Sequence, residues 1–383
     1  MNVEPYEIVV TDEQIDDLRT RLSLTRWPEA ETPDDWSQGV PLAYTQEVVE
    51  YWQQDYNMQR LAQRLNVYDN FLLNIDGLDI HFLHIQSLRS DAQPLILTHG
   101  WPGSVVEFLK VIEPLRHPDN DSDPAFHLVI PSLPGFGFSG KPTEPGWGIE
   151  KIADTWAKLM PALGYDTYFA QGGDWGAIVT TALARQHPQA CKGIHLNMVV
   201  VPPDPNSGDL TEHEISALQG LQHYNDWDSG YSKQQSTRPQ TLGYALVDSP
   251  AGQAAWILEK FWAWTDCNGH PENVLSRDEL LDNVMVYWLN AAGASSGRLY
   301  WESFGGARNF DEIAVPMGGT IFPKEIFRTS QRFAEKIFTN IIHWDEKQTG
   351  GHFAAFEQPQ VYVEEVRNAF SKVKCPPVCF SSQ

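Results

Sequence analysis

The segment "GGDWG" at residues 172–176 holds the residues whose types and spacing most clearly suggest chemistry. It follows the apolar run "TYFAQ" and precedes "AIVTTALARQ", which is the pattern of a sharp turn that lifts a nucleophile between a strand and a helix. The central residue is Asp174. Because an aspartate is already ionised at neutral pH, it needs no base to attack carbon. The turn therefore predicts substitution at a strained or activated carbon, such as an epoxide or a carbon–halogen bond.

The alternative is that Asp174 only caps the helix that begins at Trp175. Two other motifs favour catalysis. His352, in "TGGHFAAFE", follows the last predicted strand, and Glu325, in "GGTIFPKEIF", follows the preceding one. The order nucleophile, acid, histidine is that of a catalytic triad on a strand-and-helix scaffold. We expect Glu325 to orient His352, which would activate the water that hydrolyses an ester on Asp174, although a glutamate in a first helical turn could simply stabilise its helix.

The segment "LTHGWPGS" follows another predicted strand and precedes a predicted helix. A loop of this type can supply one backbone N–H of an oxyanion hole, here that of Trp101. The second N–H should come from Trp175, directly after Asp174. Together the two donors would stabilise the negative charge that develops when water attacks an enzyme ester.

The composition fits an enzyme that acts on a small neutral molecule. The 383 residues can bury a large core, and 27 Lys and Arg against 50 Asp and Glu give a formal charge of −23. This charge repels nucleic acid and anionic membrane surfaces. Neither a signal peptide nor an apolar run of about 18 residues is evident, so we expect a soluble, cytoplasmic protein without a membrane anchor.

No cofactor and no metal is expected, because the sequence has no HExxH motif, no Walker A motif and no glycine fingerprint for a dinucleotide. Water would be the only cosubstrate. The four cysteines lack the spacing of a disulfide framework or a zinc site. Cys191 and Cys267 are expected to be structural thiols, whereas Cys375 and Cys379, in "CPPVC", could close a small disulfide loop or bind metal adventitiously.

The core of the chain alternates short apolar strands with helical stretches. The predicted strands are "PLILTHG", "FHLVIPSL", "TYFAQGG", "KGIHLNMVV", "VPMGGTIFP" and "FTNIIHWDE". Such alternation predicts a mostly parallel sheet covered by helices on both faces. Between the fourth and fifth of these strands lie about a hundred helix-like residues rich in Trp and Tyr. Ligands bind at the carboxyl ends of strands in such sheets, so we expect this insertion to form a lid there.

The N-terminal part is expected to be helical. Thr11 and Gln14 form a capping box at the start of one helix, a second helix is expected from Thr45 to Asn66, and a β-hairpin turns at Asp76-Gly77. A last helix is expected from about Ala355 to Ser371. The predicted organisation is an N-terminal helical extension, a first part of the core, a helical lid and a second part of the core, at residues 1–70, 71–200, 201–310 and 311–383.

With these motifs in hand, the chain resembles the epoxide hydrolases of the α/β-hydrolase fold, in the microsomal-type branch with an extra N-terminal domain. The resemblance runs from about Tyr6 to Ser371. It is carried by the segments "RLSLTRWP", "DDWSQGVPL", "LNIDGLDIHFLH", "HGWPGS", "PSLPGFGFSG", "GGDWGA" and "GGHFAAFE". It implies an α/β-hydrolase fold with a mostly parallel eight-stranded sheet, a helical lid inserted after strand six and an N-terminal helical extension.

The resemblance also implies two lid tyrosines that donate hydrogen bonds to the epoxide oxygen. The matching segments point to Tyr231, in "SGYSKQQS", and Tyr300, in "ASSGRLYWESF". A phenol has a pKa of about 10, so it is protonated at neutral pH and can stabilise a developing alkoxide. Tyr244 and Tyr287 also fall in the lid and remain alternatives to Tyr300. Trp101, Trp175 and Phe136 are candidates to line the pocket, whereas the core should receive Trp256, Trp262 and Trp264.

Two other functions are weighed against an epoxide hydrolase. A haloalkane dehalogenase also uses an Asp-Trp turn and a histidine base, but a halide is stabilised by Trp or Asn N–H groups rather than by tyrosine hydroxyls. A non-catalytic binding protein on the same fold would typically have lost part of the triad. The expected partners are a small neutral epoxide and water, without nucleic acid. The resemblance also suggests a homodimer, although no residue in the sequence indicates one.

Overall fold

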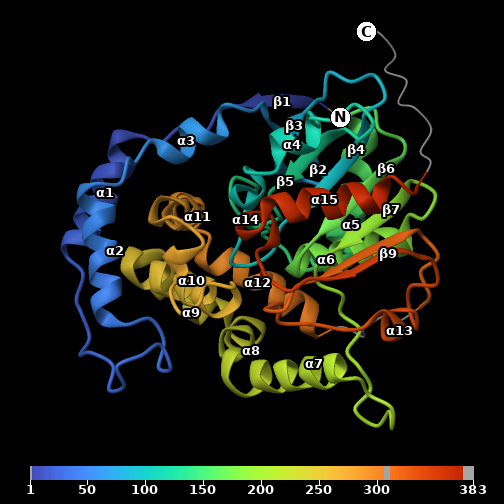
Figure 1. The fold of residues 1–383 in the computed structure, drawn as a ribbon. Coiled ribbons are helices and arrows are strands. Elements are labelled where there is room, and N and C mark those ends of the chain that lie inside the picture. The colour runs from blue at the N-terminus through green and yellow to red at the C-terminus, as the bar shows by residue number, and fades with distance from the viewer. Residues whose placement is uncertain (1, 306–310, 374–383) are drawn as a thin grey trace.

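The computed structural model describes residues 2–305 and 311–373, which form a nine-stranded sheet with helices around it (Figure 1). The strand order is β1-β2-β3-β5-β4-β6-β7-β8-β9. Strands β1, β2, β3 and β5 are joined by antiparallel pairs, whereas all pairs from β5 to β9 are parallel. The strands are β1 Val3–Tyr6, β2 Asn70–Ile75, β3 Leu78–Ile85, β4 Gln93–Thr98, β5 Phe126–Pro131, β6 Tyr168–Gly172, β7 Cys191–Leu196, β8 Met317–Ile321 and β9 Ile341–Glu346.

The predicted parallel strands are confirmed as β4 to β9, and the hairpin at Asp76-Gly77 as β2 and β3. Every residue of β5, β6 and β8 is buried, as expected for strands covered on both faces. The helices in the first half of the chain are α1 Asp12–Ser23, α2 Leu42–Gln54, α3 Arg60–Leu65, η1 Val105–Phe108, α4 Ile112–Arg116, α5 Ile149–Ala162 and α6 Asp174–Gln186.

A run of helices separates β7 from β8 along the chain and lies at the lower left of the sheet (Figure 1). It comprises α7 Glu212–His223, η2 Tyr224–Asp228, α8 Gly230–Thr237, α9 Pro239–Asp248, α10 Pro250–Trp264, η3 Pro271–Asn273, α11 Arg277–Leu289 and α12 Gly293–Phe304. The C-terminal part contributes α13 Gln331–Ala334, α14 Ala354–Glu357 and α15 Pro359–Phe370.

The sheet has nine strands rather than the expected eight, because residues Val3–Tyr6 add an edge strand that the sequence pattern did not predict. The capping box at the start of α1 is confirmed: the Thr11 side chain accepts from the Gln14 N–H, and the Gln14 side chain accepts from the Thr11 N–H. Cys191 and Cys267 are both buried. Cys375 and Cys379 lie outside the described residues.

The prediction of one helix from Thr45 to Asn66 is wrong, because residues 55–59 separate α2 from α3. The Asn57 side chain accepts from the Gln59 N–H, which competes locally with helical hydrogen bonding. The last helix is likewise divided, into α14 and α15. Pro359 has no N–H and disfavours a helical conformation of the residue before it, so α15 begins anew there.

Helix α11 connects the N-terminal helices to the loop that follows β4, and Figure 1 shows it between the blue helices and the sheet. Its Asp282 is fully buried and receives hydrogen bonds from Arg60, Arg64 and Tyr56 at 3.0, 2.7 and 2.7 Å. A buried carboxylate requires such partners to offset its loss of hydration. The N-terminal segment thereby fixes the position of α11.

The adjacent residues of α11 bind the loop after β4. Asn283 donates to the Pro102 carbonyl and accepts from the Ser104 hydroxyl, each at 2.7 Å. One turn further along, the Tyr287 hydroxyl donates to the Gly103 carbonyl at 2.7 Å. Residues far apart in the sequence therefore hold the loop that carries Trp101.

Candidate active site

The turn between β6 and α6 presents Asp174 in the left-handed region, with φ of 49°. This conformation is uncommon for any residue other than glycine, and a non-glycine residue pays for it in strain. The flanking glycines are required by close approach: a Cβ on Gly172 would lie 2.1 Å from the Gly176 carbonyl oxygen, and one on Gly176 would lie 1.9 Å from that of Thr98. Close packing within the turn and against the end of β4 therefore requires glycine at both positions.

The structure brings the three predicted triad residues together at the carboxyl ends of neighbouring strands. His352 Nε2 lies 3.3 Å from Asp174 Oδ2, and His352 Nδ1 lies 2.7 Å from Glu325 Oε1. The His352 and Glu325 side chains are at most 1 % exposed, whereas that of Asp174 is 13 % exposed and lines a cavity. Asp174 begins α6 itself, and its side chain makes no capping bond, so the cap reading does not account for it.

The two carboxylates control the charge of the imidazole. Burial alone would lower the pKa of His352, but Glu325 and Asp174 outweigh that effect and raise the pKa well above its ordinary value. The two carboxyl groups on either side of the imidazole therefore favour its protonated form. Loss of the negative charge on Asp174 would remove one of the two carboxylates that raise the pKa of His352.

The loop after β4 also reaches Asp174. The backbone N–H of Trp101 donates to Asp174 Oδ1 at 2.7 Å, which leaves Oδ2 as the oxygen that faces His352. The N–H of Trp175 belongs to the first turn of α6, where backbone donors have no intrahelical partner. The Trp101 N–H thus contacts the carboxylate directly, and the Trp175 N–H stays a predicted donor.

Tyr231 on α8 and Tyr300 on α12 pack against Trp101 and Trp175, the residues beside Asp174, but neither tyrosine is among the residues that line the cavity. Trp101 stacks on Tyr231 with ring centroids 4.7 Å apart and contacts Tyr300 edge-on at 6.0 Å. Tyr300 also meets Trp175 edge-on at 4.7 Å. Burial raises the pKa of both phenols well above the ordinary value, so both remain hydrogen-bond donors at neutral pH.

The structure separates these tyrosines from the two alternatives. Tyr244 is 70 % exposed on α9, and the Tyr287 hydroxyl is bound to Gly103. The Tyr300 hydroxyl, by contrast, is buried without a hydrogen-bond partner among the described residues. Tyr224 was missed: its hydroxyl lies 3.1 Å from that of Tyr231, and its place in a π-helical turn gave no signal in the sequence.

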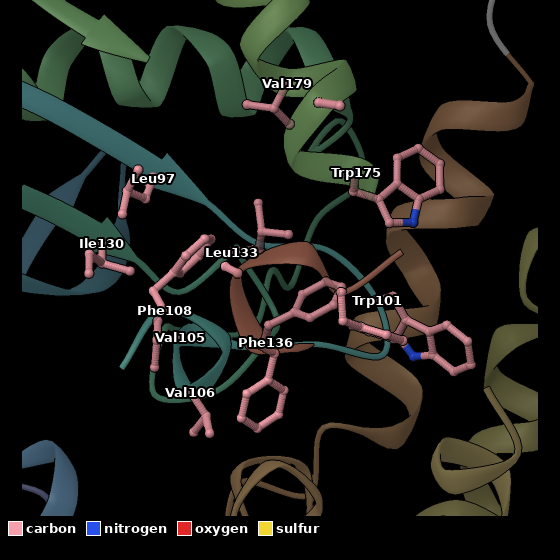
Figure 2. Close-up of a cluster of buried hydrophobic side chains, with 14 of the residues drawn as sticks. Leu97, Trp101, Val105, Val106, Phe108, Ile130, Leu133, Phe136, Trp175 and Val179 are labelled. Atoms are coloured by element: carbon pink, nitrogen blue, oxygen red, sulfur yellow. The ribbon is translucent and has the colours of Figure 1, made fainter. Parts of the chain in front are cut away.

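Trp264 is fully buried, as expected, and its ring also lies edge-on to that of His352 at 5.1 Å and to that of Tyr231 at 5.2 Å. Trp256 and Trp262, also expected in the core, are only partly buried. Trp101 lines the cavity as expected, whereas Trp175 and Phe136 are not among its lining residues, and Phe136 belongs to the apolar cluster beneath the site. Figure 2 shows that cluster, in which β4, η1, β5 and α6 contribute Leu97, Val105, Val106, Phe108, Ile130 and Val179, beside Leu133 and Phe136.

A further carboxyl group was also missed. Glu107 lines the same cavity as Asp174 and His352, although no motif of the sequence pointed to it. Its only signal was a charged residue inside the apolar run "VVEFL". Across residues 2–305 and 311–373, no group of three or more His, Cys, Asp or Glu residues could hold a metal ion, and no helix is long and apolar enough to cross a membrane.

Comparison with known proteins gives matches over nearly the whole chain. A family model described as "Epoxide hydrolase N terminus" matches residues 3–108, and one described as "alpha/beta hydrolase fold" matches residues 93–235. The chain is 50 % identical over 376 residues to a protein of Stigmatella aurantiaca named as an epoxide hydrolase, covering 97 % of this chain and 86 % of the relative. It is 33 % identical to epoxide hydrolase 1 of Sus scrofa, covering 96 % and 88 %.

Two solved structures match throughout. Juvenile hormone epoxide hydrolase of Bombyx mori superposes with a TM-score of 0.90 at 30 % identity, covering 97 % of this chain and 94 % of that one. The epoxide hydrolase of Aspergillus niger gives a TM-score of 0.89 at 31 % identity, with coverage of 98 % and 97 %. The sheet, its order and these matches define an α/β-hydrolase. Within that fold the chain belongs to the epoxide hydrolases, and it is a hydrolytic enzyme.

The electrostatic coupling of the triad can be measured directly. Glu325→Gln removes one of the two carboxylates that raise the pKa of His352, while burial still lowers it. The pKa of His352 should therefore fall. Imidazole resonances followed by NMR across pH should show this shift. In the wild type, the raised pKa of His352 contributes to the stability of the fold, and this contribution is fully present below about pH 6.5, the ordinary pKa of histidine. It is lost as the pH rises through the raised pKa of His352. Unchanged titration of His352 in the variant would contradict this coupling.

Proposed function

We propose that this enzyme opens a small aryl or alkyl epoxide, such as styrene oxide, by attack of the Asp174 carboxylate and then hydrolyses the resulting ester. The observation that carries the proposal is the arrangement of Asp174: one carboxylate oxygen is bound by the Trp101 N–H, and the other faces His352 and the cavity. An anion held this way is an activated nucleophile without a proton to lose.

In the first half-reaction, Asp174 Oδ2 forms a bond to a ring carbon, and the bond from that carbon to the epoxide oxygen breaks. The epoxide oxygen takes a proton from a tyrosine hydroxyl, Tyr231 or Tyr300, and the phenol regains a proton from solvent. Both phenols are kept protonated by burial, which supports this role. The unpartnered hydroxyl of Tyr300 has a free donor for the substrate.

In the second half-reaction, His352 takes a proton from water, and the hydroxide formed attacks the ester carbon of Asp174. Esterification has by then removed the negative charge of Asp174 that favours the protonated imidazole, so His352 first releases its proton to solvent and becomes the neutral base that this step requires. Glu325 holds the imidazole through Nδ1. The charge on Oδ1 of the tetrahedral intermediate would be stabilised by the N–H groups of Trp101 and Trp175. Its collapse breaks the bond between the ester carbon and Oδ2, and the diol leaves with a proton from His352.

We further propose that the helices within residues 201–310 form a lid over the cavity, between the core parts at residues 71–200 and 311–383, with residues 1–70 as an extension that supports it. The contacts of Tyr231 and Tyr300 with Trp101 and Trp175 support the lid assignment. A cytoplasmic location is proposed from the sequence, and a homodimer from the family resemblance.

The ester should be trapped when its hydrolysis is blocked. In His352→Gln, styrene oxide should leave a stoichiometric mass increase on the peptide that contains Asp174, because alkylation proceeds and no base activates water. Asp174→Ala should be inactive and carry no added mass. Mass spectrometry of digested enzyme after a brief incubation measures both. Release of halide from haloalkanes without turnover of any epoxide would instead indicate a dehalogenase, and no adduct under any condition would indicate a binding protein.

The two tyrosines should act in alkylation. Tyr231→Phe and Tyr300→Phe should each slow ester formation by roughly 10- to 100-fold, because one donor to the epoxide oxygen remains, while ester hydrolysis changes much less. Tyr244→Phe, on an exposed tyrosine, is the matched control and should change neither rate. Single-turnover stopped-flow kinetics separates the two half-reactions. Equal slowing of both by either substitution would mean that these rings only shape the pocket.

A further inference from the structure

Glu107 is a carboxyl group that the mechanism above does not use, yet it lines the reaction cavity. It lies in η1, and the residues that line the cavity with it include Trp101, Asp174 and His352. Its side chain is remote from bulk solvent but borders the cavity. The carboxyl group therefore has access to molecules that enter the site rather than to the protein surface.

The position of the carboxyl group depends on Gly103. A Cβ placed on Gly103 would lie 1.4 Å from Glu107 Oε1, so any side chain there would have to displace the carboxyl group. Gly103 follows Trp101 and Pro102 in the loop that binds Asp174, and its carbonyl is held by Tyr287. The loop therefore both donates to the nucleophile and leaves space for Glu107 beside it.

Glu107 lacks the arginine or lysine partner that several buried carboxyl groups of this protein have. Asp282, Glu214 and Glu365 each have an arginine or lysine within ion-pair distance, whereas no cation pairs with Glu107 in residues 2–305 and 311–373. Burial raises its pKa to about 8; His352 opposes this rise and Asp174 adds to it. Burial of a carboxyl group without a cation costs free energy, and at a cleft such groups often serve function.

We propose that Glu107 holds the water that hydrolyses the Asp174 ester: one O–H of this water donates to His352, and the other donates to a Glu107 carboxyl oxygen. When His352 takes the first proton, the hydroxide formed attacks the ester carbon, and Glu107 keeps the second proton hydrogen-bonded and the oxygen directed at that carbon. Glu107 itself gains and loses no proton in the step. This role rests on the proposed function, because it requires the ester.

Either protonation form of Glu107 has an oxygen that can accept this hydrogen bond. Conversion of Asp174 to a neutral ester also removes a charge that disfavours ionisation of Glu107. An ionised carboxylate accepts a stronger hydrogen bond than a neutral acid. The contribution of Glu107 should consequently be larger in hydrolysis than in alkylation.

Substitutions that keep the volume of the side chain test the hydrogen bond. Glu107→Met removes both acceptor oxygens, whereas Glu107→Gln keeps one. In single-turnover reactions with styrene oxide, Glu107→Met should slow ester hydrolysis roughly 10- to 100-fold, leave alkylation within about threefold, and accumulate the Asp174 adduct. Glu107→Gln should retain most of the hydrolysis rate. Glu365→Gln, at a buried carboxyl on α15 bound by His343 and Lys347, is the control and should not change the ratio of the two rates.

Gly103→Ala provides a second variant if Glu107→Met does not fold, because the added methyl group displaces the Glu107 carboxyl without changing residue 107. It too should slow hydrolysis more than alkylation. A wild-type rate of ester hydrolysis in either folded variant, or equal slowing of both half-reactions, would overturn the role of Glu107. Absence of an ester in the wild type and in His352→Gln would overturn the proposed function instead, so the two failures are distinguishable.

Discussion

The site depends on keeping an ionised carboxylate at a strained, mostly buried turn. Asp174 occupies the left-handed region in a segment where the residues two positions before and after it, Gly172 and Gly176, leave no room for a Cβ. Its carboxylate accepts from the Trp101 N–H and faces His352, which is in turn held by Glu325. Each of these groups lies directly beyond the end of a parallel strand, so the register of β4, β6, β8 and β9 fixes the geometry. In the proposed mechanism, formation of the ester removes the charge on Asp174 that favours protonation of His352, so the histidine becomes available as a base for the second half-reaction.

The support of the site extends beyond the sheet. On α11, Asp282 is bound by the N-terminal helices, while Asn283 and Tyr287 bind the loop that carries Trp101. The N-terminal residues thus contribute to the position of a donor to Asp174 without touching the cavity. The same loop, through Gly103, leaves the space that Glu107 occupies. A substitution in the N-terminal helices can therefore shift α11 and, through it, the loop that donates to Asp174.

Sequence reasoning located the parts of the site that follow from local pattern. Asp174, His352 and Glu325 could be found because each follows an apolar strand in a glycine- or proline-containing loop, and parallel strands end at one edge. Sequence reasoning could not find three other features: the break between α2 and α3, the edge strand β1 and the hydroxyl contact of Tyr224 with Tyr231. Each of them depends on contacts between distant segments or on a π-helical turn. The position of Glu107 in the cavity could not be predicted from the sequence either, because only the fold brings "VVEFL" beside the triad.

The central claim, that Asp174 supplies the oxygen that attacks the epoxide, is tested most directly by isotope labelling. Enzyme in excess over styrene oxide is allowed a single turnover in water enriched in ¹⁸O. If water attacks the ester carbon of Asp174, the first diol carries no ¹⁸O, and the label is found in the carboxylate of the Asp174 peptide. A labelled diol from the first turnover, with an unlabelled Asp174, would show that water opens the ring directly and would contradict the account.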